Sequence, residues 1–267
     1  MSSRLVFLKL GGSLITVKDQ PHTPRLDVVE RLAQEIAEAR ALNQNLQILL
    51  GHGSGSFGHV AASKYKTRLG VKSVDEWKGF VEVWRQAAEL NHLVMTALEK
   101  AKLPVIAFPP SAMVFARECK VDTWNLDILL AALEKGLLPV IYGDVIFDKV
   151  LGGTILSTED LFTYLARRMR PSQLLFAGSQ PGVWTDFPDN TSLLREITPA
   201  SFPQIEARLK GSNATDVTGG MADKVRQMIA LVEELPGVRA MIFSGETPGY
   251  LRGSLLGEEL GTVIHGL

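Results

Sequence analysis

The sequence predicts an α/β fold in which a mainly parallel, open sheet is covered by helices on both faces. Three observations support this prediction. Short apolar runs recur along the 267 residues, segments with helical spacing separate most of them, and glycine-rich loops follow the first two runs. Strands that alternate with helices in this way form parallel sheets joined by helical crossovers.

The predicted strands are six apolar runs, at 4–10, 46–50, 104–108, 138–142, 173–177 and 239–244. A chain of this length can bury a large core as one α/β domain or as two smaller ones. No internal repeat, low-complexity tract or linker divides it cleanly.

Two long helices are predicted in the first half of the chain. Residues 24–42 carry apolar side chains at three- and four-residue spacing with charged side chains between them, as a covering helix does. Residues 75–101 carry one broad apolar stripe, which includes Phe80, Val83 and Trp84. Most positions of such a stripe are ordinary core.

Capping residues mark helix boundaries farther along the chain. Thr123 and Thr198 are typical helix N-caps, and Gly136 and Gly237 are typical helix stops before the next strand. The segment 148–153, which contains Gly152 and Gly153, predicts a hairpin.

Charge and composition exclude several classes of partner. The chain has 28 basic and 29 acidic residues, so it has no field that attracts nucleic acid or an anionic membrane. No apolar run approaches the roughly 18 to 20 residues that span a bilayer. We expect a cytoplasmic protein without nucleic-acid or membrane partners. Cys119 is the only cysteine, which excludes an intramolecular disulfide and a cysteine-based metal cluster.

Two glycine-rich loops, at 9–13 and 51–59, are typical of phosphate sites. Glycine lets the backbone approach a ligand closely, and N–H groups at the start of a helix face an anion. Lys9 is placed to reach a phosphate held by the first loop. His59 lies just inside the helix that the second loop opens, where a nearby anion would offset the helix dipole. His52, at the strand end, is equally well explained by a structural role.

Neither loop fits both the sequence and the context of a common nucleotide-binding motif. In the first loop the lysine precedes the glycines, unlike in a Walker A sequence. The second loop reads Gly-x-Gly-x-x-Gly, but it follows the second strand, and the region where the acidic residue is expected offers Val71, Lys72 and Ser73, with Asp75 only slightly farther on. P-loop and Rossmann folds are therefore disfavoured.

A third polar loop, at 216–224, enters another helix. Thr218 is a candidate cap, Gly219 and Gly220 open the backbone, and Lys224 points back towards the helix start. Three such loops, two with a lysine, predict phosphoryl transfer, because its transition state is stabilised mainly by positioning and by cations.

Acidic residues lie between the second and third loops. Asp144 and Asp160 are candidates to orient the lysines or to hold Mg²⁺ through water. Ser157, Thr158 and Glu159 also match a helix N-cap followed by an acidic first turn.

These motifs together resemble the isopentenyl phosphate kinases, a family of the amino acid kinase superfamily. The resemblance rests on Lys-Leu-Gly-Gly-Ser at 9–13 with Lys18, on the whole loop 51–59, on Tyr-Gly-Asp-Val at 142–145, and on Asp-Val-Thr-Gly-Gly-Met-x-x-Lys at 216–224. They follow in family order and spacing over nearly the whole chain. The loop that bears His59 is the most discriminating.

The resemblance implies one three-layer αβα sandwich over residues 1–267. It implies that the N-terminal half, about 1–170, binds a prenyl monophosphate and that the C-terminal half, about 171–267, binds ATP with Mg²⁺. The implied reaction phosphorylates isopentenyl phosphate to isopentenyl diphosphate. A homodimer is also implied, and no resident metal site.

The resemblance also assigns roles to residues. The implied catalytic residues are Lys9, Lys18, His59 and Asp144, with Asp144 organising the lysines. The implied ATP-binding residues are Lys9, Gly11, Gly12, Ser13, Gly55, Ser179, Gly182, Thr218, Gly219, Gly220 and Lys224. The implied acceptor-binding residues are Gly53, Ser54, His59, Ser157, Thr158, Phe80, Val83 and Trp84. The last three would wall the prenyl pocket.

Three segments depart from the family pattern. Ser54 stands where the family commonly has glycine, and Ser-Thr-Glu-Asp at 157–160 replaces Ser-Gly-Asp-Asp. Gly-Ser-Gln-Pro-Gly-Val at 178–183 replaces Thr-Asp-Val-Asp-Gly-Val beside the nucleotide. The second departure affects the acceptor contact at Thr158, and the third affects nucleotide affinity or base preference.

Two alternatives remain open. A fosfomycin kinase shares the histidine-bearing loop and acts on a small phosphonate. A catalytically silent nucleotide-binding sensor is favoured only by the altered loop 178–183. The volume of the apolar pocket separates the first alternative from a prenyl phosphate kinase.

Overall fold

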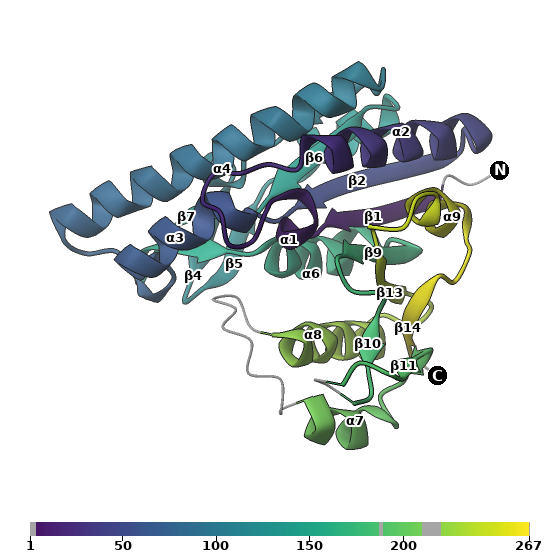
Figure 1. Ribbon diagram of the computed structural model, residues 1–267. Helices are drawn as coiled ribbons and strands as arrows, with labels where there is room; N and C mark the ends of the chain where they lie inside the picture. The colour runs from purple at the N-terminus through teal and green to yellow at the C-terminus, as the bar shows by residue number, and fades with distance from the viewer. Residues whose placement is uncertain (1–3, 187–188, 210–219, 267) are drawn as a thin grey trace.

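An eight-stranded sheet runs through the centre of the protein (Figure 1). The structure is a computed structural model that describes residues 4–186, 189–209 and 220–266. The strand order in the sheet is β12-β14-β13-β9-β1-β2-β6-β3. Its strands are β1 Arg4–Leu10, β2 Leu46–His52, β3 Val105–Ala107, β6 Leu138–Tyr142, β9 Gln173–Gly178, β12 Glu196–Ile197, β13 Arg239–Ser244 and β14 Gly261–His265.

In the order from β13 to β3, each strand is parallel to the next. Strand β14, on the other side of β13, is antiparallel to it. All six strands predicted from the apolar runs are present in this sheet, as β1, β2, β3, β6, β9 and β13. Strands β12 and β14, which extend the sheet beyond β13, have no counterpart among the six predicted runs.

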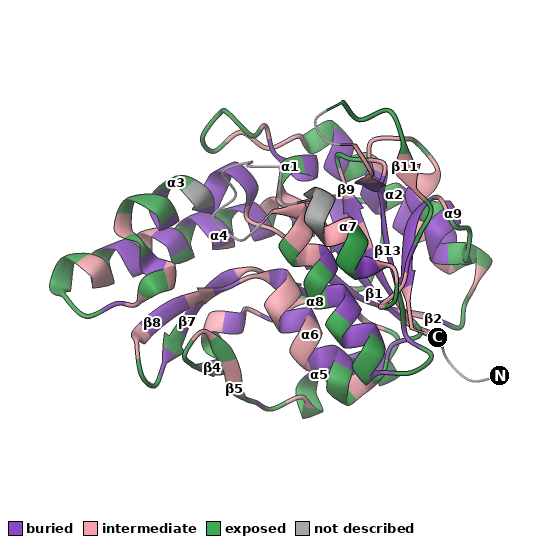
Figure 2. Ribbon diagram, turned by 90° about the horizontal axis from the view of Figure 1, so that it is seen from below, coloured by how far each residue is buried: buried purple, intermediate pink, exposed green. Residues whose placement is uncertain are grey.

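Helices cover both faces of the sheet (Figures 1 and 2). The α-helices of the described residues are α1 Gly12–Ile15, α2 Leu26–Leu42, α3 Gly55–Tyr65, α4 Val74–Lys100, α5 Asp127–Glu134, α6 Thr158–Met169, α7 Phe202–Leu209, α8 Met221–Glu234 and α9 Tyr250–Leu256. Two short 3₁₀ helices are η1 Thr67–Leu69 and η2 Pro110–Ala112. Within the described residues, no helix is both long and apolar enough to cross a membrane.

Two separate apolar cores lie on opposite faces of the main sheet. Strand β1 shows the alternation, because Val6 and Leu8 face one core while Phe7 faces the other. The first core joins the strands to α2, α4 and α9, and the second joins them to α5, α6 and α8. In Figure 1, α2 and α4 lie above the sheet and α6 and α8 below it. The predicted three-layer αβα architecture is therefore confirmed.

A second, four-stranded sheet packs under helix α4, in the order β5-β4-β7-β8. Its strands are β4 Val114–Arg117, β5 Lys120–Trp124, β7 Asp144–Asp148 and β8 Gly152–Leu156. The antiparallel pair β7–β8 confirms the hairpin predicted at 148–153. A further short pair joins β10 Val183–Trp184 to β11 Leu193–Leu194. Apart from its β7–β8 hairpin, the four-stranded sheet was not predicted.

One predicted helix cap is wrong. Thr123 lies in strand β5, and helix α5 begins only at Asp127. The Oδ1 atom of Asn125 accepts the Asp127 N–H at 2.9 Å just before that helix. Threonine is also a good strand former, so its type alone does not separate the two structures.

The other predicted boundaries are present. Thr198 Oγ1 accepts the N–H of Ser201 at 3.3 Å, in the turn that leads into α7. Gly136 has a φ of +73° and follows α5, and Gly237 has a φ of +86° in the turn after α8. Both glycines adopt the left-handed conformation that ends helices.

Candidate active site

The loops that follow the parallel strands are joined by backbone hydrogen bonds at the carboxyl edge of the main sheet. Each bond runs from a glycine N–H to a carbonyl oxygen of the neighbouring strand or loop: Gly245 to Gly178 at 2.8 Å, Gly11 to Ala177 at 2.8 Å, Gly53 to Leu10 at 3.0 Å and Gly143 to His52 at 3.2 Å. We call these four bonds the glycine row. The carboxyl edge is where open parallel sheets bind ligands.

The two glycine loops predicted to bind phosphate are in contact with each other. A Cβ atom placed on Gly12 would lie 2.4 Å from the backbone nitrogen of Gly55, and one on Gly53 would lie 2.9 Å from that of Gly12. Gly55 also has a φ of +49°, which disfavours larger residues. Side chains at these positions would push the loops apart, so the two loops form one continuous backbone surface.

Only some N–H groups of this surface are free to bind an anion. Gly11 and Gly53 donate their N–H groups within the glycine row, which corrects the expectation that the Gly11 N–H holds an ATP phosphate. Gly12 and Gly55 begin α1 and α3, and neither helix has a side-chain N-cap bond. Within the described residues, the N–H groups of Gly12 and Gly55 have no hydrogen-bond partner. They are the donors left for a phosphate.

A buried ion pair lies next to this surface. Lys9, near the end of β1, places its Nζ 2.7 Å from Oε1 of Glu159, and the two side chains are 10% and 11% exposed. Burial alone would raise the pKa of Glu159, but the positive charges of Lys9 and Lys224 outweigh it and lower the pKa. Glu159 is therefore ionised, and its charge interacts with two lysines that the sequence had assigned to the site.

Asp144 does not organise the lysines in this structure, contrary to expectation. Its Oδ2 accepts the N–H of Ser111 at 3.0 Å, and its Oδ1 accepts the N–H of Val145 at 2.9 Å. Burial raises the pKa of Asp144 to about 6. Glu159 takes the expected role at Lys9, and the only signal for it in the sequence was its place in an acidic first turn.

The first turn of α6 is fixed by its own caps and by strand β2. Ser157 and Asp160 form a capping box, which confirms the predicted N-cap. The Thr158 hydroxyl donates to the carbonyl oxygen of His52 at 2.6 Å. A Cβ atom on Gly51 would lie 2.4 Å from the Thr158 methyl group. The absence of a side chain at Gly51 therefore lets α6 pack closely against the end of β2. The turn is thus held where Glu159 reaches Lys9.

His52 has a structural role, one of the two alternatives that the sequence left open. The ring is fully buried, with Nδ1 3.0 Å from the carbonyl oxygen of Gly53 and Nε2 3.2 Å from Oδ1 of Asn91. It stacks on Tyr142 with ring centroids 5.3 Å apart. Burial lowers the pKa of His52, so the imidazole is neutral near pH 7.

The remaining residues of the predicted acceptor side are only partly described. His59 lies on α3, one turn after Gly55, and its side chain is outside the described residues. Ser54 is half-buried at the N-cap of the same helix. Lys18 is exposed in the connection between α1 and α2.

The predicted nucleotide side is also partly described. Gly220 is the N-cap of α8, and Lys224 is half-buried on its first turn. Thr218 and Gly219 lie outside the described residues. Two further predicted residues follow β9, an exposed Ser179 and a buried Gly182 whose added Cβ would lie 2.4 Å from Oγ1 of Thr262. Ser13 is exposed on α1.

Two of the three predicted pocket-wall residues join one apolar cluster. Phe80 and Val83 are buried between α4, α3 and the small sheet, with Val145 among their neighbours. The Phe80 ring lies 5.3 Å from that of Phe147 on β7. Trp84 is 43% exposed and is not part of this cluster, so it is a poor candidate for the wall.

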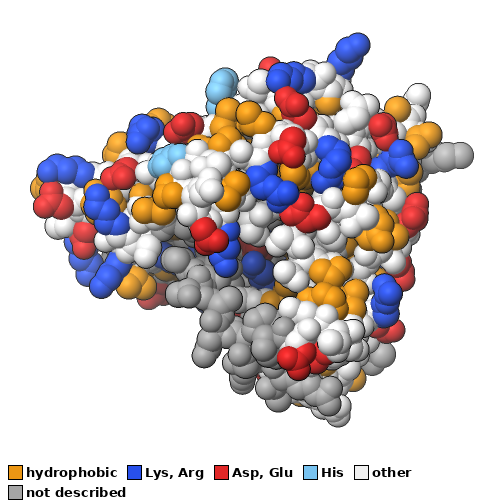
Figure 3. All heavy atoms as spheres, in the orientation of Figure 1, with side chains coloured by type: hydrophobic (Ala, Val, Ile, Leu, Met, Phe, Trp, Pro, Cys, Tyr) orange, Lys and Arg blue, Asp and Glu red, His pale blue; other side chains and the backbone are white. Residues whose placement is uncertain are grey.

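Basic side chains lie in a hollow on the face of the molecule that Figure 3 shows. In Figure 3, Lys and Arg side chains lie in the hollow near the centre of the face, while basic and acidic side chains alternate around it. A hollow lined by cations suits a phosphorylated ligand.

The comparison of the whole chain with a known family agrees with the motifs. A sequence profile of the amino acid kinase family matches residues 4–244. The carboxyl-edge loops after β1, β2, β6 and β9 lie within the match.

Relatives named isopentenyl phosphate kinase match over almost their full length. An isopentenyl phosphate kinase from Methanothermobacter thermautotrophicus is 33% identical over 274 aligned residues, covering 98% of this chain and 99% of that protein. One from Haloferax volcanii is 37% identical, covering 98% and 99%. A crystal structure of an isopentenyl phosphate kinase superposes with a TM-score of 0.82 at 28% identity, covering 98% of this chain and all of that one.

Proposed function

Because this chain belongs to the amino acid kinase family, we propose that it transfers the γ-phosphoryl group of ATP to isopentenyl phosphate. The products are ADP and isopentenyl diphosphate. Full-length relatives with that activity support the proposal. In the structure, the supporting observation is the buried Lys9–Glu159 pair beside the two uncapped helix starts.

The reaction needs no nucleophile from the protein. A phosphate oxygen of the acceptor attacks the γ-phosphorus in line, a new P–O bond forms, and the bond to the β-phosphate oxygen breaks. The free N–H groups of Gly12 and Gly55 and the ammonium of Lys9 would stabilise the charge on the transferring group. Lys18 would add a second cation. His59 and the Ser54 N–H would hold the acceptor phosphate.

The nucleotide would enter as its magnesium complex. Mg²⁺ would neutralise phosphate charge, and it takes few protein ligands when phosphate oxygens are available. Among the described residues, no group of three or more His, Cys, Asp or Glu side chains is arranged to hold a metal. Glu159 is already paired with Lys9, so the ion would be held chiefly by ATP oxygens. Gly220 and Lys224 would contact the nucleotide.

The apolar cluster under α4 favours a prenyl phosphate over fosfomycin. Phe80, Val83 and Val145 pack against one another, and a hydrocarbon tail would lie against their partly exposed neighbours Trp77 and Phe147, whereas fosfomycin is small and polar. Burying five carbons against such a wall is favourable by about 0.8 kcal/mol for each CH₂.

A homodimer is also proposed. Strand β3 is one edge of the main sheet, and its Ile106 is 38% exposed. An open edge of this kind is a place where a second chain can pair. Sedimentation equilibrium should give twice the mass of the 29.2 kDa chain, and a monomer mass at working concentration would contradict the dimer.

The activity is tested by measuring ADP release with four acceptors: isopentenyl phosphate, dimethylallyl phosphate, geranyl phosphate and fosfomycin. We expect the highest kcat/KM with a C5 prenyl phosphate. Lys9→Met is the matched inactive control, because it removes the cation and keeps the apolar stem. Turnover of fosfomycin alone, or ATP binding without turnover of any acceptor, would overturn the proposal.

A further inference from the structure

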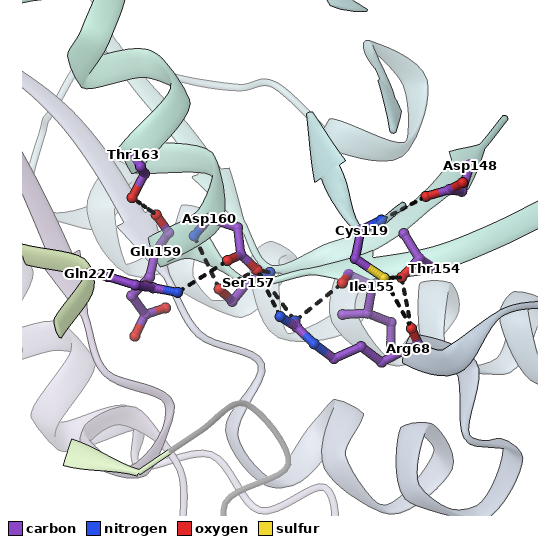
Figure 4. Close-up of polar contacts among 10 residues, drawn as sticks. All are labelled: Arg68, Cys119, Asp148, Thr154, Ile155, Ser157, Glu159, Asp160, Thr163 and Gln227. Carbon is purple, nitrogen blue, oxygen red and sulfur yellow. Dashed lines mark hydrogen bonds and ion pairs between the residues drawn. The ribbon is translucent and has the colours of Figure 1, made fainter. Parts of the chain in front are cut away.

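Two consecutive carboxylates on the first turn of α6 point to different partners (Figure 4). Glu159 pairs with Lys9, whereas Asp160 contacts Arg68. Both Nη1 and Nη2 of Arg68 lie 3.3 Å from Oδ2 of Asp160. Among its described contacts Asp160 has no lysine, contrary to the role first considered for it.

Arg68 is itself firmly anchored to the small sheet. It lies in η1, which links α3 to α4, and its Nη1 also donates to the carbonyl oxygen of Ile155 at 3.3 Å. Its own carbonyl oxygen accepts from the hydroxyl of Thr154 at 3.0 Å and from the thiol of Cys119 at 3.4 Å. The guanidinium therefore connects strand β8 to the start of α6.

Asp160 links this anchor to the first turn of α6, which carries Glu159, the partner of Lys9. Its Oδ2 also accepts from the N–H of Ser157 at 2.9 Å and from the Ser157 hydroxyl at 2.8 Å. On the other side, Oδ1 lies 3.5 Å from Nε2 of Gln227, which is three residues after Lys224 on α8. Asp160 thus contacts both η1 and α8, while its neighbour Glu159 pairs with Lys9.

We propose that Arg68 is a positioning residue which, through Asp160, fixes the first turn of α6 so that Glu159 holds Lys9 in line with the transferring phosphoryl group. The inference rests on the proposed kinase function. The Arg68 and Asp160 side chains are 29% and 17% exposed, and a partly exposed ion pair adds little to stability. A displacement of about 1 Å in a catalytic group, however, can cost about 10²-fold in rate.

The main test compares Arg68→Met with Arg117→Met. Arg117 makes a similar 3.3 Å ion pair with Asp122 in the β4–β5 hairpin. This ion pair involves no residue of β1 or α6, the elements that carry Lys9 and Glu159. Arg68→Met should lower kcat by about tenfold or more, with KM for both substrates and Tm nearly unchanged. Arg117→Met should keep the parent kcat. Arg68→Lys, which keeps the charge, should recover part of the loss and guards against a misfolded variant.

A double-variant experiment shows whether Arg68 acts through Asp160. If it does, Arg68→Met combined with Asp160→Asn loses no more kcat than Asp160→Asn alone. Losses that multiply, or an unchanged kcat in Arg68→Met, would overturn the inference.

A second readout does not depend on turnover. The rate of acetylation of the Lys9 amine by acetic anhydride, followed by mass spectrometry, should rise in Arg68→Met and not in Arg117→Met. An equal rate in both would overturn the inference. A parent enzyme that turns over no prenyl phosphate would instead overturn the proposed function, so the two failures are distinguishable.

Discussion

Lys9 and Glu159 are the residues on which the proposed chemistry depends most. The sequence placed Lys9 correctly at the end of the first strand, because an apolar run followed by two glycines predicts where the backbone turns. The partner of Lys9 could not be predicted in this way. It depends on α6 docking against β2 through Gly51 and Thr158, which is a three-dimensional contact.

We predict that Glu159→Gln lowers kcat by about 10²-fold, because the Lys9 ammonium loses its anchor while its charge remains. Glu159→Asp should retain more activity, since aspartate keeps the negative charge with a shorter reach. Steady-state kinetics with isopentenyl phosphate measures both. Removing one member of a buried pair can also cost about 3–5 kcal/mol, so Tm is recorded alongside. A Gln variant with the parent kcat would show that the pair is only structural.

The raised pKa of Asp144 predicts a pH-dependent stability. Burial raises the pKa from 3.8 to about 6, so between those pH values the folded chain keeps a proton that the unfolded chain releases. The protonated carboxyl contributes its full stabilisation of the folded state below pH 3.8, and this contribution is lost as the pH rises through about 6. The loss amounts to about 3 kcal/mol.

Asp144→Asn should therefore flatten the fall in unfolding free energy between about pH 4 and pH 7, measured by urea denaturation. Asp27→Asn, at an exposed carboxyl on α2, is the control and should keep the parent slope. Parallel curves for the parent and Asp144→Asn would contradict the assignment.

At the scale of elements, buried strands and long helices were the predictable part. The six core strands are nearly continuous apolar runs, and both long helices have a clear helical period. The small sheet escaped prediction because its strands are short and interrupted by charged residues, as in β5 with Lys120 and Asp122. Its buried side chains also divide between two clusters, because Val145 packs under α4 whereas Val114 and Ile146 join the core of α5 and α6.

That packing makes the wall of the proposed tail pocket a property of α4 and β7 together. We predict that Phe80→Leu and Val83→Ala raise kcat/KM for geranyl phosphate relative to isopentenyl phosphate. Each methylene that a pocket accepts or refuses changes the free energy of transition-state binding, and so the ratio of kcat/KM values, by about 1–3 kcal/mol. Trp84→Ala is the matched control, because Trp84 is exposed on the same helix and should leave the ratio unchanged.

If Phe80→Leu and Val83→Ala fold with the parent Tm and keep the parent ratio of the two substrates, the pocket wall lies elsewhere. If only Trp84→Ala changes the ratio, the exposed Trp84 side chain lies at the entrance to the pocket. The assignment of the wall to Phe80 and Val83 is then wrong.

At the scale of the whole molecule, two apolar cores hold one sheet whose carboxyl edge carries the Lys9–Glu159 pair and the loops of Gly12 and Gly55. The division into an acceptor half and a nucleotide half stays a prediction. The positions of the first two glycine loops were readable from the sequence, because each follows a recognisable strand. Which loop N–H groups remain free was not, since it depends on neighbours across the sheet.

The glycine row has a consequence for how the site moves. Its four N–H groups continue the hydrogen-bond ladder of the sheet beyond the ends of the strands. Loops usually exchange their amide protons with solvent through small local openings. Here an opening at one loop breaks its bond to the next, so the four glycine protons should exchange slowly and together, close to the rate set by unfolding of the sheet itself. The backbone platform that receives the phosphates is, in this respect, part of the core.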